Sequence, residues 1–179
     1  MAANDQHARS HTPNGGVAWL APPELEERLE EEINRAERHG TQLSCLLVVI
    51  DNLEEMAREH GGALREQTLG YVAGALRREL RRFDRIARLS DRELLIVLPG
   101  ADGPRGEMVA RRVLDRLRTI KVEAQGARRP LRISVGLAAW SDGSSSVELL
   151  GRTRAAAQLG AEDARVGTIS PPPLGRDSA

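Results

Sequence analysis

The run at residues 43–51, LSCLLVVID, restricts the fold of this chain more than any other feature. Apart from Ser44 and the closing Asp51, every residue in it is apolar. The run is too short to span a bilayer. Nearly continuous hydrophobicity over this length is typical of a strand that is buried on both faces of a sheet. We therefore expect a fully buried strand inside a layered fold.

Helical and strand-like patterns alternate around this run. Apolar residues recur at helical spacing between Pro22 and Gly40. Further helices are predicted over residues 53–62, 63–82, 104–119 and 146–160, and strands over the two arms of 85–99, over 131–140 and over 164–170. In the helix at 104–119, the residues expected to face inward are Met108, Val109, Val113, Leu114 and Leu117. This order predicts an α/β or α+β sandwich, a mixed sheet with helices packed on it.

The two ends of the chain differ from this periodic middle part. Residues 1–21 are polar and rich in Gly, Asn and His, so we expect a disordered lead. Residues 171–179, PPPLGRDSA, cannot continue a helix or a strand, so we expect a flexible tail. The folded domain is therefore predicted to span residues 22–170.

Charge and composition exclude several classes of function. The formal net charge is +0, which argues against a general binder of nucleic acid or of a membrane surface. The Lys+Arg total is 26, yet Lys121 is the only lysine, so any role that needs a lysine has one candidate. The N-terminus has no apolar signal core, and we expect a soluble, cytoplasmic protein.

Cysteine and histidine give no sign of a metal or redox centre. Cys45 is the only cysteine, so no disulfide can form within the chain, and a small buried hydrophobe is the simplest interpretation. No two of His7, His11, His39 and His60 have the spacing of zinc ligands on one element. We therefore expect no metal and no cofactor.

Several segments in order resemble the GGDEF domain of bacterial diguanylate cyclases, over roughly residues 24–170. They are LEERLEEEINRAERHGTQLSCLLVVID, RRFDRIARLSDRELLIVLP, RISVGLAAW with its Gly136, and VELLGRTRAAAQLG. The resemblance implies a mixed sheet with helices packed on it, related to the palm fold of nucleotidyl cyclases. It also implies an ancestral activity, the condensation of two GTP molecules into cyclic di-GMP with the help of a divalent cation.

Read against the family's G-G-D-E-F motif, the hairpin turn has lost most of that chemistry. The motif positions hold Ser90, Asp91, Arg92, Glu93 and Leu94. The resemblance places metal-binding carboxylates at Arg92 and at Val49, and neither residue can bind a metal ion. We expect the nearby Asp51 to pair with Arg92 rather than to replace a ligand.

Other family positions are also degenerate. The resemblance implies a guanine-binding asparagine at Ala57 and a phosphate-contacting lysine at Ala161. Glu66 corresponds to a second guanine contact, and Arg165 is a further residue that would remain from the active site together with Glu93. The sequence therefore predicts a domain with no catalytic residues and no cyclase activity.

A second family site, the product-inhibition site, is retained as a pattern. Its Arg-x-x-Asp motif is present as Arg81 and Asp84, six residues ahead of Ser90. Arginine can donate two hydrogen bonds to the O6/N7 edge of guanine or bind a phosphate. A further arginine on the next helix would be Arg112 or Arg111. In this arginine-rich segment, a chance match or an exposed ion pair at a helix end is the simpler alternative.

Three functions remain open from the sequence. The first is a cyclic di-GMP receptor that binds through Arg81, Asp84 and Arg112 and acts on an unidentified protein partner. The second is a ligand-free protein-interaction module. The third is residual GTP binding or cyclase activity, against which the missing metal ligands argue. A dimer of cyclic di-GMP molecules could bridge two copies of the domain, which would permit a homodimer.

Overall fold

Strand β1 (Leu43–Ile50) is the middle strand of a five-stranded sheet with the order β2-β3-β1-β6-β7. The structure is a computed structural model that describes residues 22–163 and 165–169. The other strands of this sheet are β2 (Arg85–Arg88), β3 (Glu93–Pro99), β6 (Ile133–Ala139) and β7 (Val166–Ile169). The helices are α1 (Pro22–His39), α2 (Leu53–His60), α3 (Gly62–Glu79), α4 (Gly103–Arg118) and α5 (Ser146–Asp163). All pairings are antiparallel except β6 with β7, which confirms the predicted mixed sheet.

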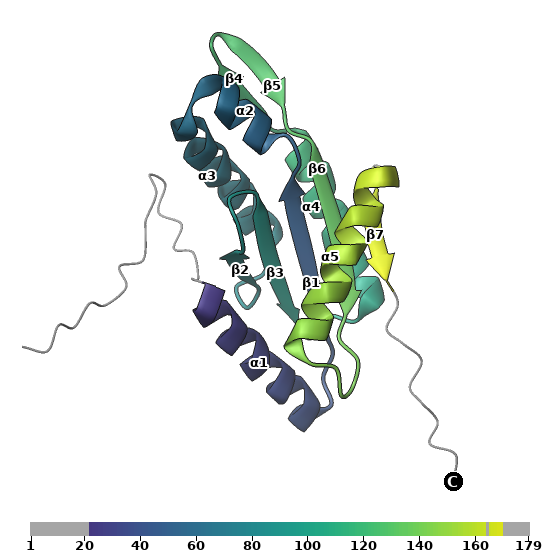
Figure 1. Cartoon of the computed structure of the whole chain (residues 1–179). Coiled ribbons are helices and arrows are strands. Elements are labelled where there is room, and N and C mark those ends of the chain that lie inside the picture. Colours follow the sequence, from purple (N-terminus) through teal and green to yellow (C-terminus); the bar gives the residue numbers. More distant parts are fainter. Residues whose placement is uncertain (1–21, 164, 170–179) are drawn as a thin grey trace, which may run out of the picture.

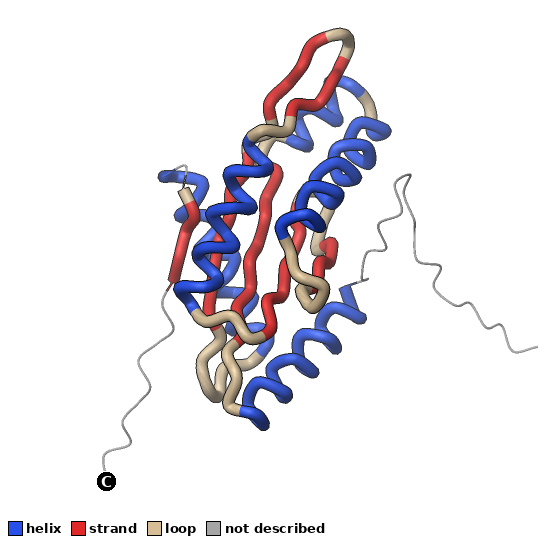
Figure 2. Tube along the Cα trace, turned by 180° about the vertical axis from the view of Figure 1, so that it is seen from behind, coloured by secondary structure: helices blue, strands red, loops and turns tan. Residues whose placement is uncertain are grey.

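Both faces of β1 are covered, as its hydrophobic run predicts. Successive residues of a strand point to opposite faces. The even-numbered residues of β1 from Leu46 to Ile50 join an apolar cluster with α3 and α4. The odd-numbered residues from Leu43 to Val49 join a second cluster with α1 and α5. Figures 1 and 2 show these two helical layers on opposite sides of the sheet.

Helix α5 lies so close to the sheet that glycine is required beneath it. A Cβ atom on Gly136 in β6 would lie 2.2 Å from the backbone nitrogen of Ala157. A Cβ atom on Gly167 in β7 would lie 1.7 Å from the carbonyl oxygen of Ala156. Because both obstacles are backbone atoms, no side-chain rotation could make room. The family landmark Gly136 is thus explained by packing.

Two details of the helices differ from the predictions. Helix α3 ends at Glu79 rather than at residue 82, because Leu80 adopts an extended backbone with φ −99° and ψ 153°. Met108, expected to face inward, is 67% exposed. Helix α4 instead turns Gly106 and Ala110 toward the sheet, and a Cβ atom on Gly106 would lie 2.8 Å from the Leu137 side chain.

The sequence pattern does not predict a second sheet, formed by β4 (Lys121–Ala124) and β5 (Ala127–Pro130). Only Val122 and Ala124 of these strands are buried, so the apolar alternation is too short to stand out. Gln125 and Gly126 both have positive φ, 50° and 76°, as a tight two-residue hairpin turn requires. Figure 1 shows this hairpin extending beyond the main sheet beside α2.

The predicted lead at residues 1–21 and tail at 171–179 lie outside the described residues, so they stay predictions. None of the described helices is long and apolar enough to cross a lipid bilayer. Within the described part of the chain, no three His, Cys, Asp or Glu side chains gather so as to hold a metal ion. Cys45 is fully buried, as expected, and burial raises the pKa of its thiol to about 12.

Candidate functional site

The turn between β2 and β3 lies beside the end of β1. The Leu89 N–H closes the turn by donating to the carbonyl oxygen of Glu93 at 2.9 Å, and the Ile50 N–H donates to the carbonyl of Arg92 at 3.0 Å. In the antiparallel register Val49 lies directly opposite Glu93, so the two side chains share a face of the sheet. The structure thus brings Val49 and the turn at residues 90–93 together.

A network of ion pairs joins this turn to the helices. Arg88 lies 3.1 Å from the Glu66 carboxylate on α3 and 2.9 Å from Asp91 in the turn. Arg65 lies 2.9 Å from Glu54 on α2 and 3.7 Å from Asp91. Asp91 stands where the family has glycine, and two arginines neutralise its charge. Glu66, the position of a guanine contact in the family, is thus bound to Arg88.

Asp51 does not pair with Arg92, so this prediction was wrong. The buried Ser134 on the neighbouring strand β6 donates its hydroxyl to Asp51 Oδ2 at 2.5 Å. The Arg92 side chain is exposed, and it forms no ion pair with the described residues. Glu93 lies 3.9 Å from Arg154 of α5, a long ion pair. Asp51 and Glu93 therefore each have a partner within the domain.

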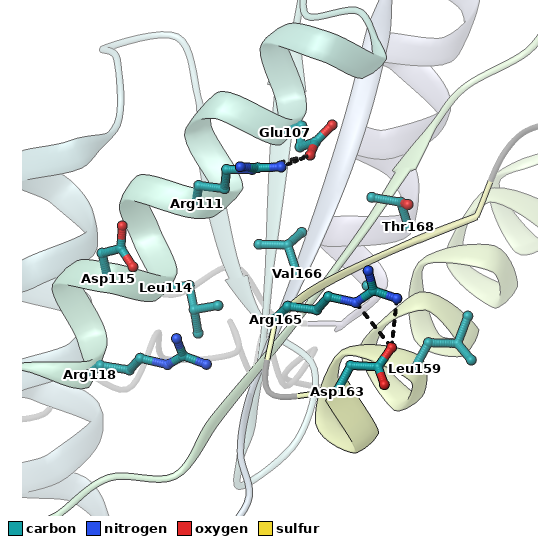
Figure 3. A pocket seen from close by; sticks show the side chains of 11 residues that line it. Glu107, Arg111, Leu114, Asp115, Arg118, Leu159, Asp163, Arg165, Val166 and Thr168 are labelled. Carbon is teal, nitrogen blue, oxygen red and sulfur yellow. Dashed lines mark hydrogen bonds and ion pairs between the residues drawn. The ribbon is translucent and has the colours of Figure 1, made fainter.

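The remaining family positions lie on α2, on α5 and just before β7. Ala57 is buried in α2, and Ala161 is exposed on α5. Arg165 pairs with Asp163 at 2.7 Å and lines a hollow of about 530 Å³ between α4, α5 and β7. Figure 3 shows this hollow, and no residue of the β2–β3 turn lines it. The structure thus places Arg165 in a hollow separate from the degenerate motif.

The Arg-x-x-Asp motif forms a closed turn immediately after α3. The Arg81 backbone N–H donates to Asp84 Oδ2 at 2.7 Å, and the Asp84 N–H donates to the Arg81 carbonyl at 3.1 Å. The two side chains form no ion pair with each other, so the ion pair considered from the sequence is absent. The Arg81 guanidinium makes no hydrogen bond or ion pair with the described residues, although its charge acts on Asp84.

Arg112 approaches this turn from α4. Its Nη2 donates to the Glu79 carbonyl, the last residue of α3, at 2.8 Å. Partial burial raises the pKa of Asp84 above its ordinary value, against the opposing effects of the Arg81 backbone N–H and of the charges of Arg81, Arg112 and Arg85. The described part of the chain thus gathers three arginines around a half-buried carboxyl group.

Arg111 and Arg112 have different surroundings on α4. Arg111 pairs with Glu107 one turn earlier on α4, at 2.5 Å. Figure 3 shows both side chains at the hollow between α4, α5 and β7. Arg112 is the one whose charge acts on Asp84. Adjacent residues of a helix point in directions about 100° apart, so only one of them can face the Asp84 turn.

Sequence reasoning missed Phe83. This residue is the only phenylalanine of the chain, and it lies between Arg81 and Asp84 with 72% of its surface exposed. A large exposed apolar side chain beside polar groups is typical of a binding surface. The signal was present in the sequence, because aromatic residues make up only 2% of the chain and one of them interrupts the motif.

The sequence matches the family described as diguanylate cyclase, GGDEF domain, over residues 23–164. Diguanylate cyclase DgcP of Pseudomonas aeruginosa is 28% identical over 116 residues, which cover 65% of this chain and 17% of that protein. The chain thus corresponds to about 17% of the length of the curated relatives that it matches.

Solved structures have the same fold. The GGDEF domain of DgcB from Caulobacter crescentus, solved in complex with c-di-GMP, has a TM-score of 0.79 at 17% identity, covering 92% of this chain and 98% of that one. Diguanylate cyclase SiaD of Pseudomonas aeruginosa, solved with its activator SiaC, has a TM-score of 0.75 at 26% identity, covering 82% and 56%. Together with the family match over residues 23–164, these structures show that the chain belongs to the GGDEF domain family.

Proposed function

We propose that this domain is a cytoplasmic receptor for cyclic di-GMP that has no cyclase activity and acts on a partner protein. The observation that carries the proposal is the turn at Arg81 and Asp84, with Arg112 beside it. The complex of the DgcB domain with c-di-GMP supports it, because that relative binds the same ligand with the same fold.

The free groups of this turn fit a guanine nucleotide. The Arg81 guanidinium can donate two hydrogen bonds to guanine O6 and N7 or to a phosphate. One oxygen of Asp84 accepts from the Arg81 backbone, which leaves the other oxygen for the N1–H and N2–H groups of guanine. The exposed ring of Phe83 offers a flat apolar surface on which a base can stack.

The surrounding charge favours an anionic ligand. Arg81, Arg85 and Arg112 all act electrostatically on Asp84, and Glu79, which lies 3.6 Å from Arg112, supplies the second negative charge near these three arginines. Cyclic di-GMP carries two phosphates, and these would supply negative charge to Arg81 and Arg85, which form no ion pair within the described residues. Ligand binding would also lower the cost of keeping a half-buried Asp84 ionised, because the guanine N–H groups donate to the charged form.

The degenerate motif supports the loss of cyclase activity. The divalent cation of the family needs oxygen ligands. An apolar Val49 and a cationic Arg92 stand at the family's two carboxylate positions, so the residues present do not fit this ion. Ala57 has no amide to bind guanine, and Glu66 is bound to Arg88. We therefore assign no catalytic step to this domain.

Calorimetric titration with cyclic di-GMP tests the receptor function. Arg81→Ala and Asp84→Asn should each weaken binding about tenfold to a hundredfold, through the loss of charge-assisted contacts worth roughly 1–3 kcal/mol. Arg112→Ala should weaken it less, and its effect should fade at high salt. Arg111→Ala is the matched control, since this neighbouring arginine pairs with Glu107 on a different side of α4.

A ligand-free protein-interaction module is the second candidate. The exposure of two large apolar side chains, Met108 at 67% and Val147 at 76%, favours it. The SiaD relative was solved with a protein activator, so a domain of this family can take part in protein complexes. The absence of heat at about 100 μM cyclic di-GMP, a weak affinity even for a small ligand, would reject the receptor in favour of this module. Equal affinities of wild type and Arg81→Ala would do the same.

A further inference from the structure

A basic hollow, distinct from the one between α4, α5 and β7, lies between α3, the end of α4 and the β4–β5 hairpin. Its volume is about 600 Å³, which is within the range of small-molecule sites. Four cationic side chains line it, together with one carboxylate; they are Arg78, Arg116, Lys121, Arg128 and Glu123. None of these residues belongs to the Arg81–Asp84 turn. The only lysine of the chain is among them.

Most of these positive charges have no partner. Within the described part of the chain, Arg78, Lys121 and Arg128 form no ion pair, and all three are exposed. Arg116 has only a long contact, 3.9 Å from Glu79. An excess of three positive charges around one concavity is unfavourable by itself in a chain whose net charge is +0. Binding of an anion would relieve this repulsion.

The cations come from separate elements, so they can bind more than one anionic group. Arg78 lies on α3, Lys121 on β4 and Arg128 on β5. In β4 the exposed residues Lys121 and Glu123 alternate with buried ones, and Arg128 lies opposite Glu123 in the hairpin register. A chain of two or three phosphates can contact several such residues, whereas a single carboxylate cannot.

Tyr71 adds a flat apolar surface to the hollow. Its ring is 52% exposed, and its hydroxyl accepts a hydrogen bond from the Gln67 side chain at 3.2 Å, one turn earlier on α3. Gly74 lies next to it on the same face, and a Cβ atom there would meet nothing within 4 Å. Packing therefore does not require glycine at this position. The open wall beside the ring leaves room for a planar base to stack on Tyr71.

We propose that this hollow binds a nucleotide that carries a diphosphate or triphosphate. The phosphates contact Arg78, Lys121 and Arg128, and the base stacks on Tyr71. Glu123 is placed to accept a hydrogen bond from a ribose hydroxyl or from an amino group of the base. The site is independent of the Arg81–Asp84 turn, because no residue is shared.

Calorimetric titration of the full chain with ATP, inorganic tripolyphosphate and adenosine, without magnesium, tests the site. ATP should bind more tightly than tripolyphosphate, and adenosine should bind weakest. Lys121→Ala, Arg128→Ala and Arg78→Ala should each weaken ATP binding about tenfold, and more at low salt. Tyr71→Ala should weaken the binding of ATP but not that of tripolyphosphate. Tyr71→Phe should bind ATP about as tightly as the wild type, because it keeps the ring.

Matched controls separate this site from folding and from general charge. Arg77→Ala and Arg129→Ala remove neighbouring exposed arginines that do not line the hollow, and both variants should bind ATP as the wild type does. Gly74→Leu should fill the hollow and weaken binding while raising the melting temperature, because leucine favours a helix more than glycine does. Arg81→Ala should leave ATP binding unchanged.

Three results would overturn the proposal. The first is no binding of ATP at about 1 mM, the weakest affinity that such a site would have. The second is an equal loss of affinity in Arg129→Ala and Arg128→Ala, which would indicate only a general charge effect. The third is equal binding of ATP and tripolyphosphate with no effect of Tyr71→Ala, which would remove the nucleotide from the proposal.

Discussion

Arg88 of β2 and Glu66 of α3 form a two-pronged ion pair, with both terminal guanidinium nitrogens 3.1 Å from Glu66 Oε1. The same guanidinium also binds Asp91 in the turn. A position that binds guanine in the family thus serves here as a contact between a strand and a helix. The charged groups of the β2–β3 turn and of the neighbouring helices thus take part in internal ion pairs.

Replacing Glu66 by Gln should therefore lower the free energy of unfolding by about 1 kcal/mol, the upper range for a partly exposed bidentate pair. Urea denaturation followed by circular dichroism would measure it. Glu31→Gln is the matched control, because its pair with Arg28 is exposed at 2.8 Å on α1 and should contribute almost nothing. A larger loss in Glu31→Gln would contradict this interpretation of Glu66.

Arg92→Asp alone should not create cyclase activity. The substitution restores one carboxylate of the family motif, but Val49, Ala57 and Ala161 still lack the groups that the family uses. The purified variant would be incubated with GTP and Mg²⁺ or Mn²⁺, and the nucleotides separated by chromatography. Turnover above a protein-free control, in the variant or in the wild type, would show that the alignment of this motif is wrong.

Acidification should weaken cyclic di-GMP binding at a higher pH than an ordinary aspartate would cause. Partial burial raises the pKa of Asp84, and its ionised form accepts hydrogen bonds from guanine N–H groups more strongly than its protonated form. Affinity measured from neutral pH downwards should fall as the pH approaches this raised pKa. In Asp84→Asn the remaining affinity should not fall in this way as the pH is lowered. If the fall of affinity persists in the variant, another titrating group causes it.

The same pKa shift has the opposite effect on the stability of the ligand-free domain, which acidification should increase. Because the pKa of Asp84 in the folded chain lies above that in the unfolded chain, folding favours the protonated form. The favourable contribution of Asp84 to the free energy of unfolding is fully present below its pKa in the unfolded chain. It is lost as the pH rises through its pKa in the folded chain. Asparagine resembles the protonated form of Asp84, so the stabilities of the ligand-free wild type and of Asp84→Asn in urea should agree most closely at the acidic end. They should differ most above the folded pKa, where the wild type has lost this contribution.

Gly136→Ala should destabilise the domain by at least about 3 kcal/mol, the upper range for overpacking. The new methyl group would lie 2.2 Å from the Ala157 nitrogen, and helix α5 would have to move away from the sheet. Thermal unfolding would measure the loss. Gly151→Ala on α5 is the control, since its Cβ atom meets nothing within 4 Å and alanine favours a helix. A neutral Gly136→Ala would mean that α5 is not held this closely.

Cys45 should be unreactive in the native protein. Burial raises the pKa of its thiol to about 12, although the charge of Arg152 opposes this shift, so almost no thiolate is present at neutral pH. A coloured thiol reagent should label the protein only after denaturant is added. Rapid labelling without denaturant would show that β1 becomes exposed in the native state.

The sequence by itself determined the features that depend on local pattern. The continuous apolar run of β1 requires cover on both faces, and the structure places α3 and α4 on one face and α1 and α5 on the other. The spacing of the Arg81–Asp84 motif before the turn is likewise fixed by the chain. Periodicity and motif spacing are properties of neighbouring residues, so they can be predicted without knowing the fold.

Only the tertiary structure decided which charged groups meet. Arg88 and Glu66 are 22 positions apart, and Ser134 and Asp51 are 83 positions apart, so no local pattern could have paired them. The direction of each α4 side chain brings the charge of Arg112, rather than that of Arg111, to bear on Asp84. The unpredicted β4–β5 hairpin supplies one wall of the basic hollow beside α3. An arginine can pair with any acid within reach of its side chain, and the fold alone determines which acids are within reach.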